Sequence, residues 1–303
     1  MSTVFVSAEA HSLKKTLNAI IDDPMDIQGK LVMKRWIDEE DMTDAFEDDL
    51  EMSGIGLLEE VPEGSELPTG TIQEGYVTRY IARKFGKKIV VTEEALDDGK
   101  YKEVIRAGQR LLRACFKTVD MDATNILIRM FNSTYVGGDN VCLANASHTI
   151  PTGATFSNTM ATPIAASRAG FIIATTSIRK MLGHDGTIEG YEPEKILCPL
   201  DQWADWKEVV GSTHAPEAGE FNRINVVNDL MSQDAVVPIK YWSNTSTNWA
   251  IKTSAERGVI FKWRKRPNSK TWVNNDQELM NYSVSARWAR GWSDPRGIYG
   301  VQA

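Results

Sequence analysis

Residues 70–132 read GTIQEGYVTRYIARKFGKKIVV (70–91), TEEALDDGKYKE (92–103) and VIRAGQRLLRACFKTVDMDATNILIRMFN (104–132). The first part is rich in β-branched and aromatic residues and is longer than an ordinary internal strand, so it predicts an extended β-arm. The last part repeats apolar side chains at helical spacing and predicts one continuous helix over about residues 101–132. Such a helix is ~48 Å long, about three times the mean helix length. An arm that leads straight into a long helix is typical of a protein that holds its neighbours.

Residues 53–70 precede this arm and are rich in turn-forming residues, with glycine or proline at positions 54, 56, 62, 64, 68 and 70. Together with the extended run they predict a long β-hairpin whose tip lies near residues 62–70. A two-stranded ribbon is only marginally stable alone in water, so a long one needs another surface to lie on. We therefore expect the hairpin to contact a second molecule.

A strongly acidic segment lies further upstream, where residues 38–51 hold nine acidic side chains and no basic one. Two interpretations stay open: a solvated surface segment, or an arm that packs spaced apolar anchors such as Trp36 and Phe46 on a neighbouring subunit. Residues 1–66 carry 17 acidic and 5 basic side chains, whereas residues 79–118 carry 11 basic and 5 acidic ones. Because like charges repel within a segment, we expect these two segments to be complementary across interfaces between copies.

The rest of the chain gives helices followed by strands. We expect helices over residues 1–23, 163–182 and 201–210, the first ended by Pro24 and the last capped by Asp201. A short buried strand is expected at residues 194–199. Strand signals dominate after residue 222, in RINVV (223–227), VVPIKYW (236–242), NWAIKT (248–253), GVIFKW (258–263) and NYSVSARWARGW (281–292). Strands after helices, without regular alternation, predict the α+β class.

Composition limits the classes of protein to consider. The 303 residues carry 34 basic and 41 acidic side chains, a formal charge of −7, which argues against general nucleic-acid affinity over the whole surface. The three cysteines have no metal-like spacing, and an odd number favours a reducing compartment. The first residues lack the features of a signal peptide, and no apolar stretch approaches the ~20 residues that cross a bilayer. We expect a soluble intracellular protein without a membrane partner.

Motifs for catalysis, cofactors or metal ions are missing from the sequence, which has no phosphate-binding glycine loop, nucleophile elbow or zinc-binding helix. His148 in ANASHT (144–149) can be read as a general base acting with Asp139, or as a hydrogen-bonding structural residue, which is the commoner role. The basic run at residues 262–266 can be read as a nucleic-acid-binding patch. The alternative is a strand end whose Phe261 and Trp263 point inward while the cations stay solvated. We expect no enzymatic activity, no cofactor and no metal.

Four segments can be compared with a known family: IVVTEEALDDGKY (89–101), VCLANASHTI (141–150), the helix–turn–strand–helix order over residues 178–210, and the ending ARWARGWSDPRGIYG (286–300). With these four segments in this order, the chain resembles the major capsid proteins of tailed bacteriophages, especially the phage Mu-like major head subunit group. The segments resemble the family's junction of extended loop and spine helix, the stretch after the spine, the start of the axial domain and the terminal strand. The resemblance covers about two thirds of the chain.

The resemblance implies the Hong Kong ninety-seven type fold, with an N-terminal arm at residues 1–52 and an extended loop, a β-hairpin, at 53–92. The peripheral domain, with the spine helix at about 101–132, takes residues 93–170 and 256–303, and the axial domain takes 171–255. The resemblance also implies a major capsid (head) protein of the virion that self-assembles through hexamers and pentamers into an icosahedral shell. That shell encloses double-stranded DNA on its inner surface and is assembled in the bacterial host cytoplasm with a portal and a scaffolding protein.

Contacts between subunits are expected at the arm, at the hairpin tip and along the basic strand. The residues are Trp36, Phe46, Pro62, Glu63, Gly64, Pro68, Arg79, Arg83, Lys84, Lys87 and Lys88. Covalent cross-linking, which one family member uses, has no motif match in this sequence. The chain holds no stretch long enough to be the family's scaffolding region, so a separate scaffold is expected. One alternative stays open, an encapsulin-like protein nanocompartment shell that loads an enzyme cargo.

Overall fold

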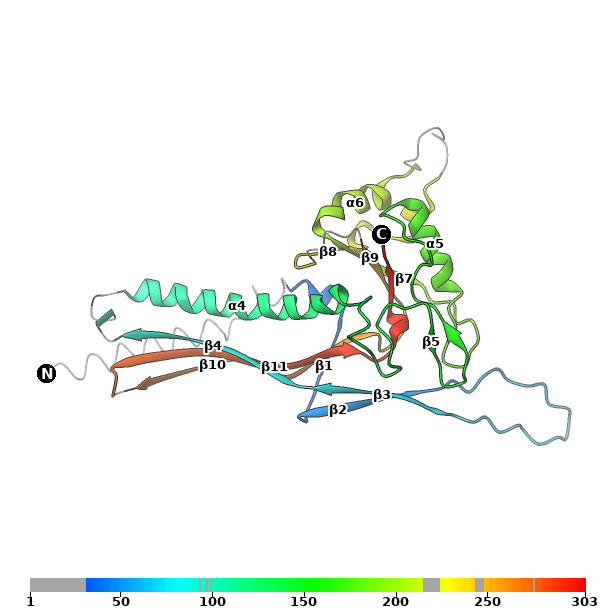
Figure 1. Cartoon of the computed structure of the whole chain (residues 1–303), viewed down its shortest axis with the longest axis horizontal. Helices are drawn as coiled ribbons and strands as arrows, with labels where there is room; N and C mark the ends of the chain where they lie inside the picture. Colours follow the sequence, from blue (N-terminus) through cyan, green and yellow to red (C-terminus); the bar gives the residue numbers. More distant parts are fainter. Residues whose placement is uncertain are drawn as a thin grey trace.

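The computed structural model describes residues 31–92, 94–95, 98, 100–214, 224–242, 248–274 and 276–303. The helix expected within residues 1–23 lies outside this part of the chain. Figure 1 shows an elongated molecule in which a long helix lies along a sheet, a second domain stands at one end, and a hairpin extends past it. The mixed α+β class predicted from the sequence is confirmed.

A four-stranded sheet forms the long axis of the molecule, in the order β1-β10-β11-β4. Its strands are β1 (Asp38–Asp41), β10 (Val259–Asn274), β11 (Leu279–Trp292) and β4 (Arg83–Thr92). Strand β1 runs parallel to β10, and the other neighbours are antiparallel. Along β11, alternate side chains such as Tyr282, Val284 and Trp288 are buried, because period-two alternation places them all on the face that packs against the helix.

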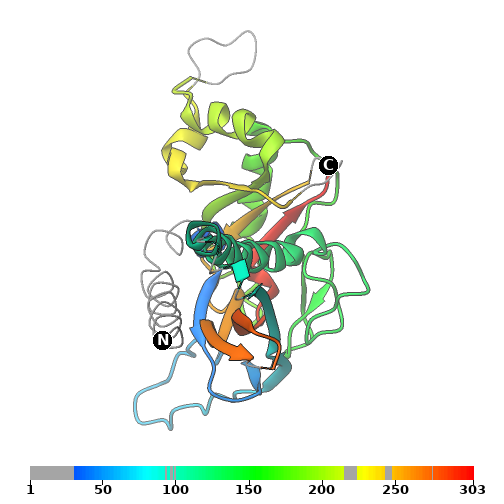
Figure 2. The same ribbon diagram turned by 90° about the vertical axis from the view of Figure 1, so that its left-hand side faces the viewer.

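That helix is α4 (Tyr101–Ile128), and it confirms the single continuous helix expected from the apolar spacing. It runs through Gly108 without a break and ends at Ile128, four residues before the expected end. Its buried side chains, including Leu112, Val119 and Leu127, share one core cluster with Phe261 and Trp288 of the sheet. Figure 2 looks roughly along α4 and shows it between this sheet and the second domain, which explains why it is buried from two sides.

The second domain is built on another four-stranded sheet, in the order β12-β9-β7-β8. Its elements are α5 (Arg168–Arg179), β7 (Pro193–Pro199), α6 (Trp203–Gly211), α7 (Val226–Leu230), β8 (Val236–Ile239), β9 (Trp249–Thr253) and β12 (Ile298–Val301). The ring of Trp206 from α6 meets Phe171 of α5 and Trp249 of β9 edge to face, and all three are buried. The helix expected at residues 163–182 and the strand at 194–199 are thus confirmed, with α5 shorter than expected.

The hairpin pairs β2 (Phe46–Met52) with β3 (Glu74–Ile81) in antiparallel register. Two features differ from the expectation. The first arm of the hairpin begins at Phe46, inside the acidic segment, and the extended run divides at Ala82, after which β4 joins β11 instead of the hairpin. The division follows from burial, because Phe85, Ile89 and Val91 of β4 pack beneath α4 and would be exposed in a free ribbon.

Two local expectations are wrong. Within RINVV, the described residues 224–227 do not form a strand; Asn225 accepts a hydrogen bond from the backbone N–H of Val227 and so begins α7. Asp201 does not cap α6, because it lies inside a 3₁₀ turn, Leu200–Gln202, that leads into the helix. The remaining short elements are the 3₁₀ turns Met33–Arg35, Gln233–Ala235 and Pro295–Gly297 and the strands β5 (His148–Thr149) and β6 (Thr155–Phe156).

Candidate intersubunit surfaces

The acidic segment 38–51 is neutralised by its own chain. Eight of its nine carboxylates form ion pairs with described residues: Asp38–Lys252, Glu39–Lys34, Glu40–Lys262, Asp41–Arg266, Glu47–Lys262, Asp48–Arg79, Asp49–Arg257 and Glu51–Arg296. One of these eight pairs, Asp48–Arg79, involves a residue of the basic segment 79–118. The expectation that this segment complements the basic segment of another copy is therefore wrong for these eight side chains, because their partners lie within the fold.

Lys262 is a well-buried cation of this network. Its ammonium lies 3.2 Å from Glu40 and 3.1 Å from Glu47, and 4.9 Å from the centre of the Tyr80 ring. Burial opposes its charge, but the hydrogen bonds to Glu47 and Glu40 outweigh that effect and raise its pKa. Phe261 and Trp263 point inward as predicted, whereas the expectation that all the cations of this run stay solvated is wrong for Lys262.

The hairpin has one polar face turned to the chain and one largely apolar face turned away from it. On the inner face, the Tyr80 hydroxyl lies 2.7 Å from the Ser293 hydroxyl, and Asp49 pairs with Arg257. On the outer face, five large apolar side chains are between 39% and 60% exposed, namely Phe46, Leu50, Met52, Val77 and Ile81. The register places Phe46 opposite Ile81 and Leu50 opposite Val77, with the Asp48–Arg79 ion pair in the row between them. We call the five apolar side chains the outer hairpin patch.

Residues 53–73 connect the two strands and extend beyond both domains (Figure 1). At their base the Gln73 backbone N–H donates to the Ser53 hydroxyl over 2.8 Å, and no strand forms between these points. This connecting loop holds four acidic residues, Glu59, Glu60, Glu63 and Glu66, and no basic one. It also exposes Ile55, Leu57, Leu58, Leu67 and Ile72. A segment that is both apolar and anionic, without strand partners, is suited to a partner surface that is apolar and cationic.

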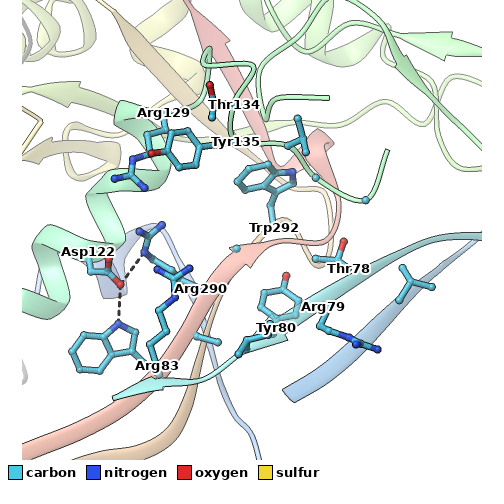
Figure 3. A pocket seen from close by; sticks show the side chains of 18 residues that line it. Thr78, Arg79, Tyr80, Arg83, Asp122, Arg129, Thr134, Tyr135, Arg290 and Trp292 are labelled. Carbon is cyan, nitrogen blue, oxygen red and sulfur yellow. Dashed lines mark hydrogen bonds and ion pairs between the residues drawn. The ribbon is translucent and has the colours of Figure 1, made fainter. Parts of the chain in front are cut away.

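A cavity of about 670 Å³ opens between β3, β11 and the end of α4. Four arginines line it, Arg79, Arg83, Arg129 and Arg290 (Figure 3), and of these Arg79 is paired with Asp48. Asp122 accepts from Arg290 over 2.9 Å and from the indole N–H of Trp288 over 2.9 Å. Burial alone raises the pKa of Asp122, but these two donors outweigh it and hold that pKa below its ordinary value. The remaining positive charge suits the cavity to an anionic group.

The expected contact residues fall into three groups. Pro62, Glu63, Gly64 and Pro68 are exposed on the connecting loop, and Phe46 and Arg79 on the outer face of the hairpin, where the Arg79 guanidinium lies 4.8 Å from the Phe46 ring centre. Arg83, Lys84, Lys87 and Lys88 are exposed on β4. Trp36 was expected among them, and that prediction is wrong. Its side chain is 1% exposed and packs in the core beneath α4.

His148 is a structural residue. Its Nδ1 lies 2.5 Å from an Asp139 carboxylate oxygen, its Nε2 lies 3.2 Å from the amide oxygen of Asn158, and its ring stacks on Phe156. The pairing with Asp139 considered for a hydrolase is present, but the imidazole is fully buried, so a substrate has no access to it. The hydrogen-bonding interpretation of His148 therefore fits the geometry.

His184 forms a second polar centre, which the sequence did not indicate beyond its place in a turn. Its Nε2 lies 3.2 Å from Asp294 and its Nδ1 lies 3.0 Å from Glu51. Hydrogen bonds to Asp294 and then to Glu51 raise its pKa to about 9. Because Glu51 belongs to β2 and Asp294 follows β11, this cluster ties the base of the hairpin to both domains.

Among the described residues no group of three or more histidine, cysteine or acidic side chains is arranged to hold a metal ion. In the same part of the chain, no helix combines the length and the apolar character that a membrane crossing requires.

The profile of the phage capsid protein family matches residues 75–301, which is most of the chain. This chain belongs to that family. It is a capsid shell protein, and its place is the virion. The comparison favours the viral shell over the compartment alternative, and no curated protein sequence matches the chain.

Solved structures with a similar fold come from the same class of particle. A chain titled "Mycobacterium phage Adephagia" has a TM-score of 0.53 at 13% identity, with 89% of each chain covered. A chain titled "Microbacterium phage Oxtober96" has a TM-score of 0.52 at 10% identity, again with 89% of each chain covered. The "Capsid of native GTA particle computed with C5 symmetry" gives 0.51 at 13% identity, with 90% of this chain and 89% of that chain covered. At these identities the likeness shows the fold.

Proposed function

We propose that the chain is the major capsid subunit of a tailed phage and forms hexamers and pentamers that close an icosahedral shell around double-stranded DNA. The observation that carries this proposal is the hairpin with its connecting loop. It extends beyond both domains and exposes the outer hairpin patch and five further apolar side chains of the loop, which in water call for a partner surface. In an assembly of identical copies that surface is the neighbouring subunit, and repeated head-to-tail contacts of this kind generate rings.

In this proposal, residues 53–92 act as the extended loop, residues 93–170 and 256–303 as the peripheral domain, 171–255 as the axial domain and 1–52 as the N-terminal arm. The strand pairing supports moving residues 46–52 from the arm to the extended loop, since they form its first strand. The contact residues are those of the loop, the outer hairpin patch and β4. The role is structural, without catalysis, and the Mu-like group is the subgroup that the proposal favours.

The proposal includes partners that the geometry of a single chain supports only indirectly. A scaffolding protein sets the curvature during assembly in the bacterial cytoplasm, and a portal occupies one vertex. DNA lies on the inner surface without base-specific contacts. Exposed cations such as Arg106, Arg110 and Arg113 of α4 are consistent with such contacts.

The experiment that tests this function is cryo-electron microscopy of particles purified from cells that produce the phage, combined with nuclease protection. We expect icosahedral shells with one vertex that differs from the others and with nuclease-resistant DNA inside. Shells without such a vertex and without DNA, which copurify with an enzyme, would support the compartment instead.

A further inference from the structure

The three long strands of the first sheet carry charge of a single sign. They hold four basic residues in β4, five in β10 and two in β11, and no acidic residue. Lys262, Arg266 and Arg290 find acidic partners at the end of the sheet near β1 and α4. The remaining cations have no such partner among the described ion pairs, so the described residues do not balance most of this charge.

The register gathers five of these cations on the face of the sheet that α4 does not cover, here called the open sheet face. Residues opposite one another share a face, and Arg287 lies opposite Lys84 on one side and Lys265 on the other. Four residues further along, Ser283 lies between Lys88 and Lys270. The side chains that alternate with these along β11, such as Val284 and Trp288, are those buried beneath α4.

Three cations in a cross-strand row destabilise a sheet unless an anion lies near them. The Nε atom of the central residue, Arg287, is buried and has no hydrogen-bond partner. A buried, unsatisfied guanidinium nitrogen is rare in folded proteins because its desolvation is costly. Both observations indicate that the row is completed by an acceptor that the described residues do not supply.

The open sheet face also has an apolar end. Trp272 and Val90 lie on either side of Asn281 in the next row and are 44% and 46% exposed. A ligand that offers only phosphates matches the cations but leaves these two side chains uncovered. The connecting loop offers both kinds of group, since it carries four carboxylates, no cation and several exposed leucines.

We propose that the open sheet face of one subunit binds the connecting loop of a second copy, with the carboxylates of residues 59–66 on the row of Lys84, Arg287 and Lys265 and the loop's leucines against Trp272 and Val90. This proposal rests on the proposed shell function and names the surface that receives the loop. The contact is heterologous, because the loop and the face are different parts of the chain, and it therefore repeats around a ring.

A charge-swap experiment tests the pairing. Lys84→Glu with Lys265→Glu, and separately Glu63→Lys with Glu66→Lys, should each lower the yield of closed shells by about tenfold or more, because like charges then meet. All four substitutions in one chain should restore the yield to within about twofold of the original. Thermal unfolding of unassembled subunits checks that every variant folds. The matched control, Arg106→Glu with Arg110→Glu on the exposed side of α4, should not be rescued by the loop substitutions.

Failure of rescue, or equal rescue of the α4 control, would overturn the proposal. Shells that form normally with Lys84→Glu and Lys265→Glu but no longer protect DNA would assign this face to nucleic acid instead. A second measurement does not depend on closed shells: subunits with Glu63→Cys mixed with subunits with Lys265→Cys should form a disulfide-linked dimer under oxidation. The parent chain, whose Cys142 and Cys198 are buried and whose Cys115 is half-buried, should not. If rings or shells form but the mixed dimer does not, the proposed binding of the loop to the open sheet face is contradicted, whereas the shell function is not.

Discussion

At the residue scale, a single buried amide connects the segments around His148. The Asn158 side chain donates to the carbonyls of Leu143, Pro295 and Ile298 over 2.6, 2.8 and 3.0 Å. Its oxygen accepts from the Asn145 N–H over 2.8 Å and faces His148. These contacts join three stretches of chain that the sequence separates by up to 140 residues.

Replacing Asn158 with alanine removes this centre and leaves several buried polar groups unsatisfied. We expect a loss of about 3 kcal/mol or more in the free energy of unfolding, because each unsatisfied buried group costs about 1–3 kcal/mol. Urea unfolding of the unassembled subunit measures it. Ser157→Ala, on the exposed neighbouring residue, serves as the control and should change stability by less than about 0.5 kcal/mol. Equal stability of the two variants would show that the amide does not hold these segments together.

His184 makes stability depend on pH. Its pKa in the folded chain is about 9, against 6.5 for the ordinary group, so the folded state binds the proton more tightly. The stabilisation is therefore fully present below about pH 6.5 and is lost as the pH rises through 9. Since a third of the side chain is exposed, solvent screening reduces the effect to about 1–2 kcal/mol.

The change should appear as a fall in the melting temperature of the unassembled subunit between pH 6.5 and 9.5, which His184→Gln removes. NMR titration of the imidazole gives its pKa directly. An ordinary pKa near 6.5 would mean that Asp294 and Glu51 do not hold the imidazolium in solution.

At the scale of elements, the spacing of apolar side chains along the sequence and their burial decided which parts of the fold could be predicted. Helix α4 follows from apolar spacing alone, and β7 to β11 from their β-branched and aromatic runs. The strand β2 could not be predicted, because its sequence FEDDLEM is mostly acidic. Its alternation becomes meaningful only when the partners of Asp49 and Glu47, which are Arg257 and Lys262, are known. In the same way, the local preference of RINVV for a strand lost to the cap that Asn225 supplies to α7.

The candidate contact surfaces were partly predictable. The amino-acid composition alone indicates the exposed loop and the basic strand β4. In contrast, the burial of Trp36 and six of the eight ion pairs of residues 38–51 depend on contacts more than 60 residues apart in sequence. The row of Lys84, Arg287 and Lys265 depends on strand register, which a single sequence does not reveal.

The outer hairpin patch gives a prediction at this scale. Val77→Thr together with Ile81→Thr should leave the stability of the unassembled subunit within about 0.5 kcal/mol, because both side chains are already exposed. Assembly should weaken, because the apolar area that a neighbour covers is reduced. Light scattering under assembly conditions measures the change. Ile188→Thr, at another exposed isoleucine, is the matched control; an equal effect of both variants would exclude a specific role for the patch.

At the scale of the whole molecule, charge is divided by location. The acidic segment 38–51 is largely paired within the chain with cations between Lys34 and Arg296, whereas the connecting loop and the open sheet face each keep charge of one sign. A chain with a net charge of −7 therefore carries two unbalanced surfaces of opposite sign at separate places. This arrangement favours ordered association of copies over nonspecific clustering, because each surface repels its own kind.

The central claim is that the chain builds a shell from copies of itself. Negative-stain electron microscopy of the purified protein, expressed alone and concentrated, tests it most directly. We predict closed shells, tubes or rings of five or six subunits with uniform dimensions. A dispersed monomer at all concentrations, under conditions in which the subunit is folded, would contradict the account.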